Sequence, residues 1–232
     1  MDKKVCCAVI VAAGKGKRMQ SSIDKQFIEL RGKSIVERTV GKFEQCDVID
    51  EIVLVTGAEH INELEEMKVR SGWNKVSGIV CGGKERQNSV YNGLCALRED
   101  TDIVLIHDGV RPFIKNEEIV LMAEEADKKK ACVLAARVKD TIKVCDENGK
   151  VMSTPDRSTL WAMQTPQAFE YKLIKKAYEQ LSESDFVTDD ASVAELAGHD
   201  VFIVEGGYDN IKITTPEDLY IAEAILKRNE EE

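Results

Sequence analysis

The 232-residue sequence contains no run of about 18 consecutive apolar residues, the length that a membrane-spanning helix requires. The apolar run near the N-terminus, residues 5–13, is much shorter. It leads directly into Gly14-Lys15-Gly16-Lys17-Arg18, which is unlike the end of a signal peptide. We therefore predict a cytoplasmic protein that does not insert into a membrane.

Positive charge is also scarce. Lysine and arginine together number 32 against 42 aspartates and glutamates, so the net charge is −10. A nucleic-acid-binding protein needs a basic surface that displaces counterions from the phosphate backbone, and we predict that this chain does not bind nucleic acid. A few local cations can still bind one small phosphate ligand within an acidic protein.

The seven cysteines include no C-x-x-C pair, and their number is odd. Most of them lie within apolar runs, where a thiol packs like a small hydrophobic side chain. This pattern predicts reduced, structural thiols, as in a cytosolic protein, and gives little support to a disulfide framework or a cysteine metal site.

Short apolar runs alternate with longer amphipathic segments, which predicts a Rossmann-like α/β fold, a mostly parallel sheet flanked by helices. Neither a repeat nor a linker interrupts the chain, so we predict one domain over residues 1–232. The expected strands are 5–12, 52–56, 79–81, 103–107, 131–136 and 201–204. The expected helices are 33–45, 58–70, 86–98, 116–130, 170–181, one opened by Thr188-Asp189-Asp190 and ended by Gly198, and one beginning at Pro216 after the N-cap Thr215.

One segment breaks this alternation. Residues 141–145 and 150–154 resemble two strands on either side of Asp146-Glu147-Asn148-Gly149. Asn-Gly favours a hairpin because both residues tolerate positive φ. A hairpin inserted in an α/β sheet fits either a surface flap or an arm that reaches a partner subunit.

The first expected strand leads into a basic loop rich in glycine, residues 12–18. A P-loop and a dinucleotide-binding fingerprint both require glycine where Met19 stands, which excludes the first and disfavours a nicotinamide oxidoreductase. A nucleotidyltransferase loop remains, in which glycines let the backbone approach a triphosphate that Lys15, Lys17, Arg18 and Lys25 neutralise. Taken alone, this segment also fits a glycine turn with solvated lysines.

Five stretches in order along the chain make the pattern specific. They are residues 12–19 with 24–27, residues 82–90, residues 106–112, residues 156–157 with 164–167, and residues 188–192 with 209–214. Together they resemble the 2-C-methyl-D-erythritol 4-phosphate cytidylyltransferase family of the non-mevalonate isoprenoid pathway. The resemblance covers nearly the whole chain and implies a nucleotidyltransferase fold.

The resemblance implies transfer of CMP from CTP to 2-C-methyl-D-erythritol 4-phosphate, with release of pyrophosphate. The attacking phosphate oxygen is already anionic, so the reaction needs positioning and cations rather than a Ser-His-Asp arrangement. The triphosphate implies Mg²⁺ as cofactor. The resemblance also implies a homodimer in which the arm at about 139–158 embraces the second subunit and completes its acceptor site.

The resemblance assigns roles to individual residues. Arg18 and Lys25 are the expected catalytic residues. The expected CTP-binding residues are Ala12, Ala13, Gly14, Gly16, Lys17, Gly82, Gly83, Arg86, Ser89 and Asp108, with Gly82, Gly83 and Ser89 at the cytosine. The expected acceptor-phosphate-binding residues are Arg111, Thr141, Arg157, Thr165, Thr188 and Lys212. Asp108 and Asp209 are the expected metal-binding residues.

Three points stay open at this stage. His107 lies within an expected buried strand, and we interpret it as a hydrogen-bonded structural group rather than a catalytic base. Ribitol-5-phosphate cytidylyltransferase shares the fold, although Ala12-Ala13-Gly14 and residues 188–192 favour methylerythritol phosphate. A catalytically silent nucleotide-binding module is the third possibility, disfavoured because cations for both substrates are present.

Overall fold

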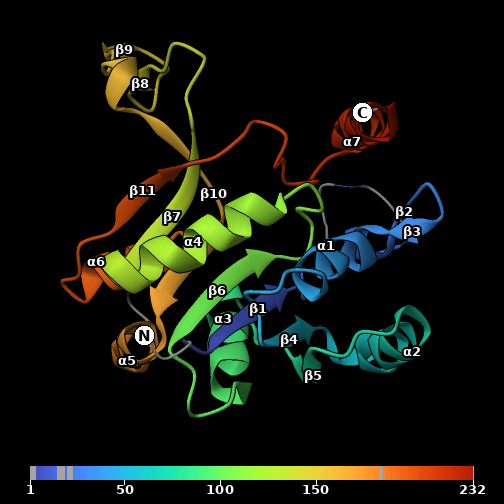
Figure 1. The fold of residues 1–232 in the computed structure, drawn as a ribbon. Helices are drawn as coiled ribbons and strands as arrows, with labels where there is room; N and C mark the ends of the chain where they lie inside the picture. Colours follow the sequence, from blue (N-terminus) through green and yellow to red (C-terminus); the bar gives the residue numbers. More distant parts are fainter. Residues whose placement is uncertain (1–3, 15–18, 20–22, 183–184, 232) are drawn as a thin grey trace.

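The computed structural model describes residues 4–14, 19, 23–182 and 185–231. Its centre is a seven-stranded sheet with the strand order β11-β7-β10-β6-β1-β4-β5 (Figure 1). These strands are β1 (Cys6–Val11), β4 (Glu51–Thr56), β5 (Val76–Cys81), β6 (Ile103–Asp108), β7 (Ala131–Arg137), β10 (Trp161–Glu170) and β11 (Phe202–Glu205). Only β10 runs antiparallel to its neighbours in this sheet as described.

Helices cover both faces of the sheet (Figure 1). The helices α1 (Ile35–Glu44), α2 (Ile61–Ser71) and α4 (Asn116–Lys129) bury side chains in one core cluster. The helices α3 (Arg86–Ala96), α5 (Tyr171–Gln180) and α6 (Asp190–Leu196) bury theirs in the cluster on the other face. A third cluster holds α7 (Pro216–Glu231) beside the short strands β2 (Glu29–Leu30) and β3 (Lys33–Ser34).

The apolar sequence of β1 explains this layering. Side chains alternate along a strand, so Ala8 and Ile10 enter one core cluster while Cys7 and Val9 enter the other. All four side chains are fully buried. Burying a side chain the size of valine or isoleucine contributes about 1.5–3 kcal/mol, so β1 is stabilised from both faces.

The structure confirms the fold class, and each expected strand and helix is found within a few residues of its expected place. Helix α6, for example, is capped by Asp189 and ends at Leu196, just before Gly198 at φ 85°. The strand β10 was not expected. Pro166 lies inside it and cannot donate to the ladder, and the pairing with β7 is irregular between Met163 and Gln167. These features hide the strand from an analysis of sequence pattern.

The expected hairpin is present as β8 (Val144–Cys145) paired with β9 (Val151–Ser153), and it projects from one end of the sheet (Figure 1). The reason given for its turn was partly wrong. Gly149 has φ 81°, but Asn148 has no positive φ. Instead, the Asp146 carboxylate accepts hydrogen bonds from the backbone of Asn148 at 2.9 Å and of Lys150 at 3.0 Å.

All seven cysteines belong to the described residues, and each is a free thiol. Cys6, Cys7, Cys46 and Cys132 are buried in the core. Burial raises the pKa of Cys7 to about 11, so this thiol stays protonated and unreactive at neutral pH. None of the described helices has the length and apolar character needed to cross a membrane.

Candidate active site

A cavity of about 480 Å³ lies beyond the carboxyl ends of β1, β5 and β6. Ligands of open α/β sheets bind at this edge. The parallel pairing of β1 with β6 places Val11 opposite Asp108, so Ala12, Ala13 and Gly14, which follow β1, line the same space as Asp108. The cavity is lined by Val11, Ala12, Ala13, Gly14, Lys25, Gln26, Gly83, Lys84, Glu85, Arg86, Ser89, Asp108, Val110 and Lys212.

The predicted cytosine segment forms one wall of this cavity. The backbone N–H of Gly83 donates to Oγ of Ser89 at 3.0 Å, and that hydroxyl donates to the carbonyl of Glu85 at 3.1 Å. A Cβ on Gly82 would lie 2.6 Å from Cβ of Ala13 and 2.8 Å from Oγ of Ser89. Only glycine therefore allows this wall to approach the loop after β1 so closely.

Asp108 is the electrostatic centre of the site. Its buried carboxylate lies 2.9 Å from Nζ of Lys212, 3.4 Å from Nε of Arg111 and 3.6 Å from Nε of Arg86. Burial alone would raise the pKa of Asp108, but Arg86, Lys212 and Arg111 outweigh it and hold this pKa well below its usual range. Counting Asp190, which pairs with Arg86, two carboxylates thus face three cations, and the remaining positive charge suits anionic ligands.

A second cavity of about 300 Å³ shares Arg86, Asp108 and Lys212 with the first. Its remaining lining residues are Arg111, Met163, Gln164, Thr165, Gln167, Thr188 and Asp189. Four of the predicted acceptor-phosphate residues therefore converge here: Arg111, Thr165, Thr188 and Lys212. The shared cations lie where ligands of the two cavities would meet.

The structure does not bring Thr141 and Arg157 to either cavity. Both are exposed in the arm, and Nη1 of Arg157 donates to the carbonyl of Lys139 at 2.8 Å. Within one chain, the predicted acceptor residues thus form two separate groups.

Arg86 has partners that the sequence analysis missed. Its two terminal nitrogens each donate to one carboxylate oxygen of Asp190 at 2.8 Å, and the hydroxyl of Tyr178 donates to the same carboxylate at 2.6 Å. Asp190 is fully buried. The stretch 188–192 was recognised as a motif, but nothing in it indicated that Asp190 binds Arg86.

His107 is structural, as interpreted from the sequence. It is fully buried, with Nε2 3.1 Å from the carbonyl of Arg111 and Nδ1 3.1 Å from Oγ1 of Thr165. Because the carbonyl can only accept, the proton belongs on Nε2 and Thr165 donates to Nδ1. Thr165 in turn accepts from the backbone N–H of Asp108 at 3.0 Å. Burial lowers the pKa of His107 to about 4, so the ring is neutral at pH 7.

The two predicted metal-binding residues differ in their surroundings. Asp108 lines the first cavity, and a single carboxylate beside phosphate groups is a usual setting for Mg²⁺. Asp209 lines neither cavity, and its carboxylate binds Arg228. The donor set therefore fits a Mg²⁺ ion held by Asp108 together with triphosphate oxygens, and lends no support to Asp209.

Of the predicted basic loop, residues 12–18, the structure describes residues 12–14. Ala12, Ala13 and Gly14 line the first cavity, whereas the predicted Gly16, Lys17 and Arg18 lie outside the described residues. Lys25 begins the short helix η2 (Lys25–Phe27) and lines the same cavity. Its neighbour Gln26, which the sequence analysis did not single out, also lines the cavity; its side chain is buried, and its Oε1 has no hydrogen-bond partner among the described residues.

A mostly parallel sheet with a glycine-lined cavity at its carboxyl edge and a cationic second cavity beside it defines a nucleotidyltransferase. The chain belongs to the 2-C-methyl-D-erythritol 4-phosphate cytidylyltransferase family (IspD), whose model matches residues 6–228.

Individual relatives agree with this membership. The chain is 50% identical over 228 residues to the 2-C-methyl-D-erythritol 4-phosphate cytidylyltransferase of Alkaliphilus oremlandii, covering 96% of this chain and 95% of that protein. It is 49% identical over 223 residues to the protein of the same name from Halalkalibacterium halodurans, covering 96% and 97%. The solved structure of 4-diphosphocytidyl-2C-methyl-D-erythritol synthase from Anaerococcus prevotii matches with a TM-score of 0.87 and 37% identity, over 97% of each chain. These names favour methylerythritol phosphate over ribitol phosphate as the acceptor.

Proposed function

We propose that the chain transfers CMP from CTP to 2-C-methyl-D-erythritol 4-phosphate, with CTP in the larger cavity and the acceptor phosphate in the smaller one. The observation that carries this assignment is that the two cavities adjoin at Arg86, Asp108 and Lys212. An acceptor phosphate in one cavity can therefore lie against the α-phosphate of a nucleotide in the other.

The reaction needs no proton acceptor from the protein. An anionic oxygen of the acceptor phosphate forms a bond to the α-phosphorus of CTP, and the bond from that phosphorus to the β-phosphate oxygen breaks. Pyrophosphate leaves with the electron pair. Catalysis rests on alignment and on cations that stabilise the charge accumulating at phosphorus, the role we propose for Arg18 and Lys25, with Lys212 at the junction of the two cavities.

Mg²⁺ would supply charge compensation for the triphosphate when bound. Asp108 is the residue that would hold it. Lys212 and Arg111, which now contact Asp108, would then turn toward substrate phosphates, whose charge replaces that of the carboxylate.

We further propose a cytoplasmic homodimer of single-domain subunits that engage through the arm. Large apolar side chains on the arm are solvent-exposed in one chain: Ile142, Val144, Val151 and Met152. Exposed apolar side chains gathered on one projecting segment suit a protein interface. A partner's arm would also supply Thr141 and Arg157, which lie apart from the cavities of their own chain.

Pyrophosphate release tests this function. The protein is incubated with Mg²⁺, each of the four nucleoside triphosphates, and either methylerythritol phosphate or ribitol phosphate. We expect release only with CTP and methylerythritol phosphate. Release only with ribitol phosphate would overturn the acceptor assignment, and no release with CTP and either acceptor would leave a silent nucleotide-binding module.

A further inference from the structure

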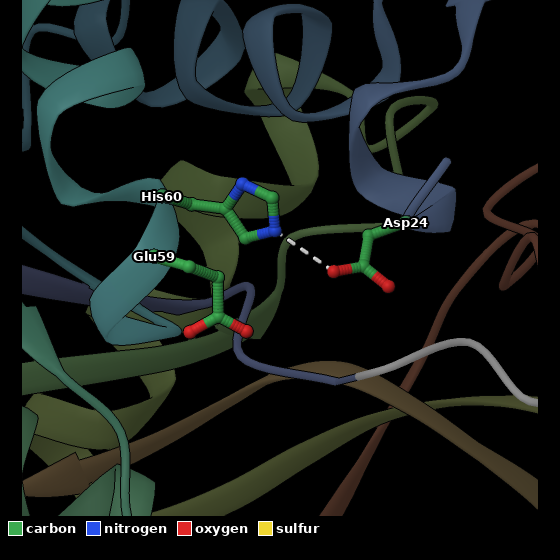
Figure 2. Close-up of side chains that lie close together, drawn as sticks. All are labelled: Asp24, Glu59 and His60. Carbon is green, nitrogen blue, oxygen red and sulfur yellow. Dashed lines mark hydrogen bonds and ion pairs between the residues drawn. The ribbon is translucent and has the colours of Figure 1, made fainter. Parts of the chain in front are cut away.

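His60 contacts Asp24 (Figure 2), the residue before Lys25 and Gln26, which line the larger cavity. It ends the short helix η3 (Ala58–His60), which follows β4, and immediately precedes α2. Its Nε2 lies 2.8 Å from Oδ2 of Asp24, and its ring lies 4.4 Å from the ring of Phe27, centroid to centroid. These two partners stand on either side of Lys25 and Gln26, so His60 holds both ends of the segment that lines the cavity.

The charges around the ring favour its protonated form. Nδ1 lies 3.1 Å from Oε2 of Glu63, one turn further along, and a carboxylate oxygen of Glu59 lies within 4.8 Å of a ring nitrogen of His60 and of a carboxylate oxygen of Asp24. Burial alone would lower the pKa of His60, but the hydrogen bonds to Asp24 and Glu63 outweigh it and raise this pKa above its ordinary value. With both ring nitrogens protonated, His60 donates to a carboxylate on each side.

A different use of the same side chains is a metal site, because Asp24, Glu59 and His60 each offer a ligand atom and these atoms lie within 4.8 Å of one another. A histidine ligand must be neutral, with a free lone pair toward the ion. Here Nε2 is occupied by Asp24, and the carboxylates favour the imidazolium. These side chains therefore suit holding a segment of the chain rather than binding a metal ion. We call the contacts of His60 with Asp24 and Phe27 the clamp.

We propose that His60 is a positioning residue that presents Lys25 and Gln26 to CTP, and that the clamp is tightened by protonation of its ring. This inference rests on the proposed function. The turn between the clamped ends is already compact, since the N–H of Phe27 donates to the carbonyl of Asp24 at 2.9 Å. Fixing Asp24 and Phe27 against His60 lowers the conformational cost of placing Lys25 at the triphosphate.

Protonation of His60 sets the direction in which CTP binding should change with pH. At a pH well below the raised pKa of His60, the ring is fully protonated and its charged contact with Asp24 is at full strength. The contact weakens as the pH rises through that pKa. The neutral ring can still donate one hydrogen bond, so the clamp is loosened rather than lost. Binding of CTP should therefore weaken toward alkaline pH more than binding of the acceptor does.

Steady-state kinetics of His60→Ala, His60→Gln and Asp24→Asn test the clamp, with His199→Gln as a control because His199 is exposed and lies outside the site. We expect His60→Ala to raise KM for CTP about three- to tenfold, with KM for the acceptor unchanged. His60→Gln, which can donate to Asp24 without a charge, should fall between the wild type and His60→Ala and should lose the part of the pH dependence that His60 causes. His199→Gln should match the wild type throughout.

Two further measurements keep the test independent of folding. An NMR titration of the His60 ring should give a lower pKa in Asp24→Asn than in the wild type, and the double variant His60→Ala/Asp24→Asn should raise KM for CTP no further than His60→Ala alone. The clamp is refuted if an active wild type is matched by folded His60→Ala and His60→Gln in KM for CTP. It is also refuted if the KM values for both substrates rise together with a lowered melting temperature, or if Asp24→Asn leaves the His60 titration unchanged. An inactive wild type would instead count against the proposed function.

Discussion

Arg86 and Asp190, 104 positions apart in the sequence, form two parallel hydrogen bonds of 2.8 Å each. Asp190 is the first residue of α6, and Nε of the same arginine lies 3.6 Å from the carboxylate of Asp108. Arg86 thus ties the start of α3 to α6 and to the junction of the two cavities. The paired nitrogens are committed to the protein, so we expect Arg86 to shape the CTP site as well as to contribute charge.

Asp190→Asn should destabilise the fold by about 3 kcal/mol, because the pair joins a fully buried carboxylate to a largely buried arginine, and its loss leaves Asp108, at 3.6 Å, as the carboxylate beside Arg86. An amide also cannot accept two hydrogen bonds from Arg86 and a third from Tyr178 as the carboxylate does. Urea unfolding measures the loss, and kcat/KM for CTP should fall as well because α6 no longer holds Arg86.

Asp100→Asn is the matched control for that measurement. Asp100 forms a similar pair with Arg98, but its side chain is 61% exposed. Exposed ion pairs contribute less than about 1 kcal/mol, so this variant should unfold close to the wild-type midpoint. Equal losses in the two variants would contradict the role given to the Arg86–Asp190 pair.

Gly82→Ala should raise KM for CTP about tenfold or more. The added methyl group would meet Ala13 at 2.6 Å and Ser89 at 2.8 Å, and the wall of the nucleotide cavity must move to accept it. Gly78→Ala in β5 is the control, because a Cβ there meets no atom of the described residues within 4 Å. If Gly82→Ala binds CTP as tightly as Gly78→Ala, the cavity wall is not where the nucleotide lies.

The sequence revealed the parts of the fold that repeat a simple pattern. The strand β1 is apolar on both faces, and the hairpin is marked by Asn148-Gly149, so both were found. The strand β10 was missed because Pro166 interrupts its pattern and because its polar residues Gln164, Thr165 and Gln167 line the smaller cavity. Gln167 illustrates this: its amide donates to Asp189 at 2.8 Å and accepts from the backbone of Ala191 at 2.7 Å.

The candidate site, like the fold, could be predicted only in part from the sequence. Glycines and cationic side chains in short motifs could be assigned to a nucleotide site. Glycine lets the backbone approach a ligand closely, and cationic side chains bind phosphate. Partners such as Asp190 for Arg86 and His60 for Asp24 could not, because each pair joins segments far apart in the sequence. Their pairing depends on how helices pack on the sheet, which short motifs do not encode.

His107 should make the protein less stable in mild acid. Its pKa is lowered to about 4 in the folded chain and is about 6.5 in an unfolded one. Between these values only the unfolded chain takes up the proton, so stability falls as the pH falls from about 6.5 to 4, by about 3 kcal/mol over the whole window. Above about pH 6.5 the same group contributes no pH dependence.

Urea unfolding of the wild type and of His107→Gln at several pH values from 7.5 to 4.5 measures this effect. Glutamine at position 107 does not titrate, so the difference in unfolding free energy between the wild type and His107→Gln should narrow as the pH falls. Other titrating groups, including His60, cancel in that difference. A constant difference across the range would show that His107 is not buried in its neutral form.

Mixing two inactive variants tests whether the arm serves the partner's site. Lys25→Ala disables the nucleotide cavity, and Arg157→Ala disables the arm. If each site combines one subunit's cavity with the other's arm, a mixed dimer keeps one intact site of its two, and random pairing of equal amounts should restore about one quarter of wild-type activity.

The control for this experiment mixes Lys25→Ala with Lys212→Ala. Both lysines line the same cavity of the same chain. A mixed dimer then has one damaged residue in each cavity, so no pairing restores activity, whichever way the arm reaches. Recovery in the first mixture and none in the second would establish that the arm crosses between subunits. Failure of the first mixture, in dimers shown by native mass spectrometry to be mixed, would mean that Thr141 and Arg157 act within their own chain, or that neither belongs to the acceptor site.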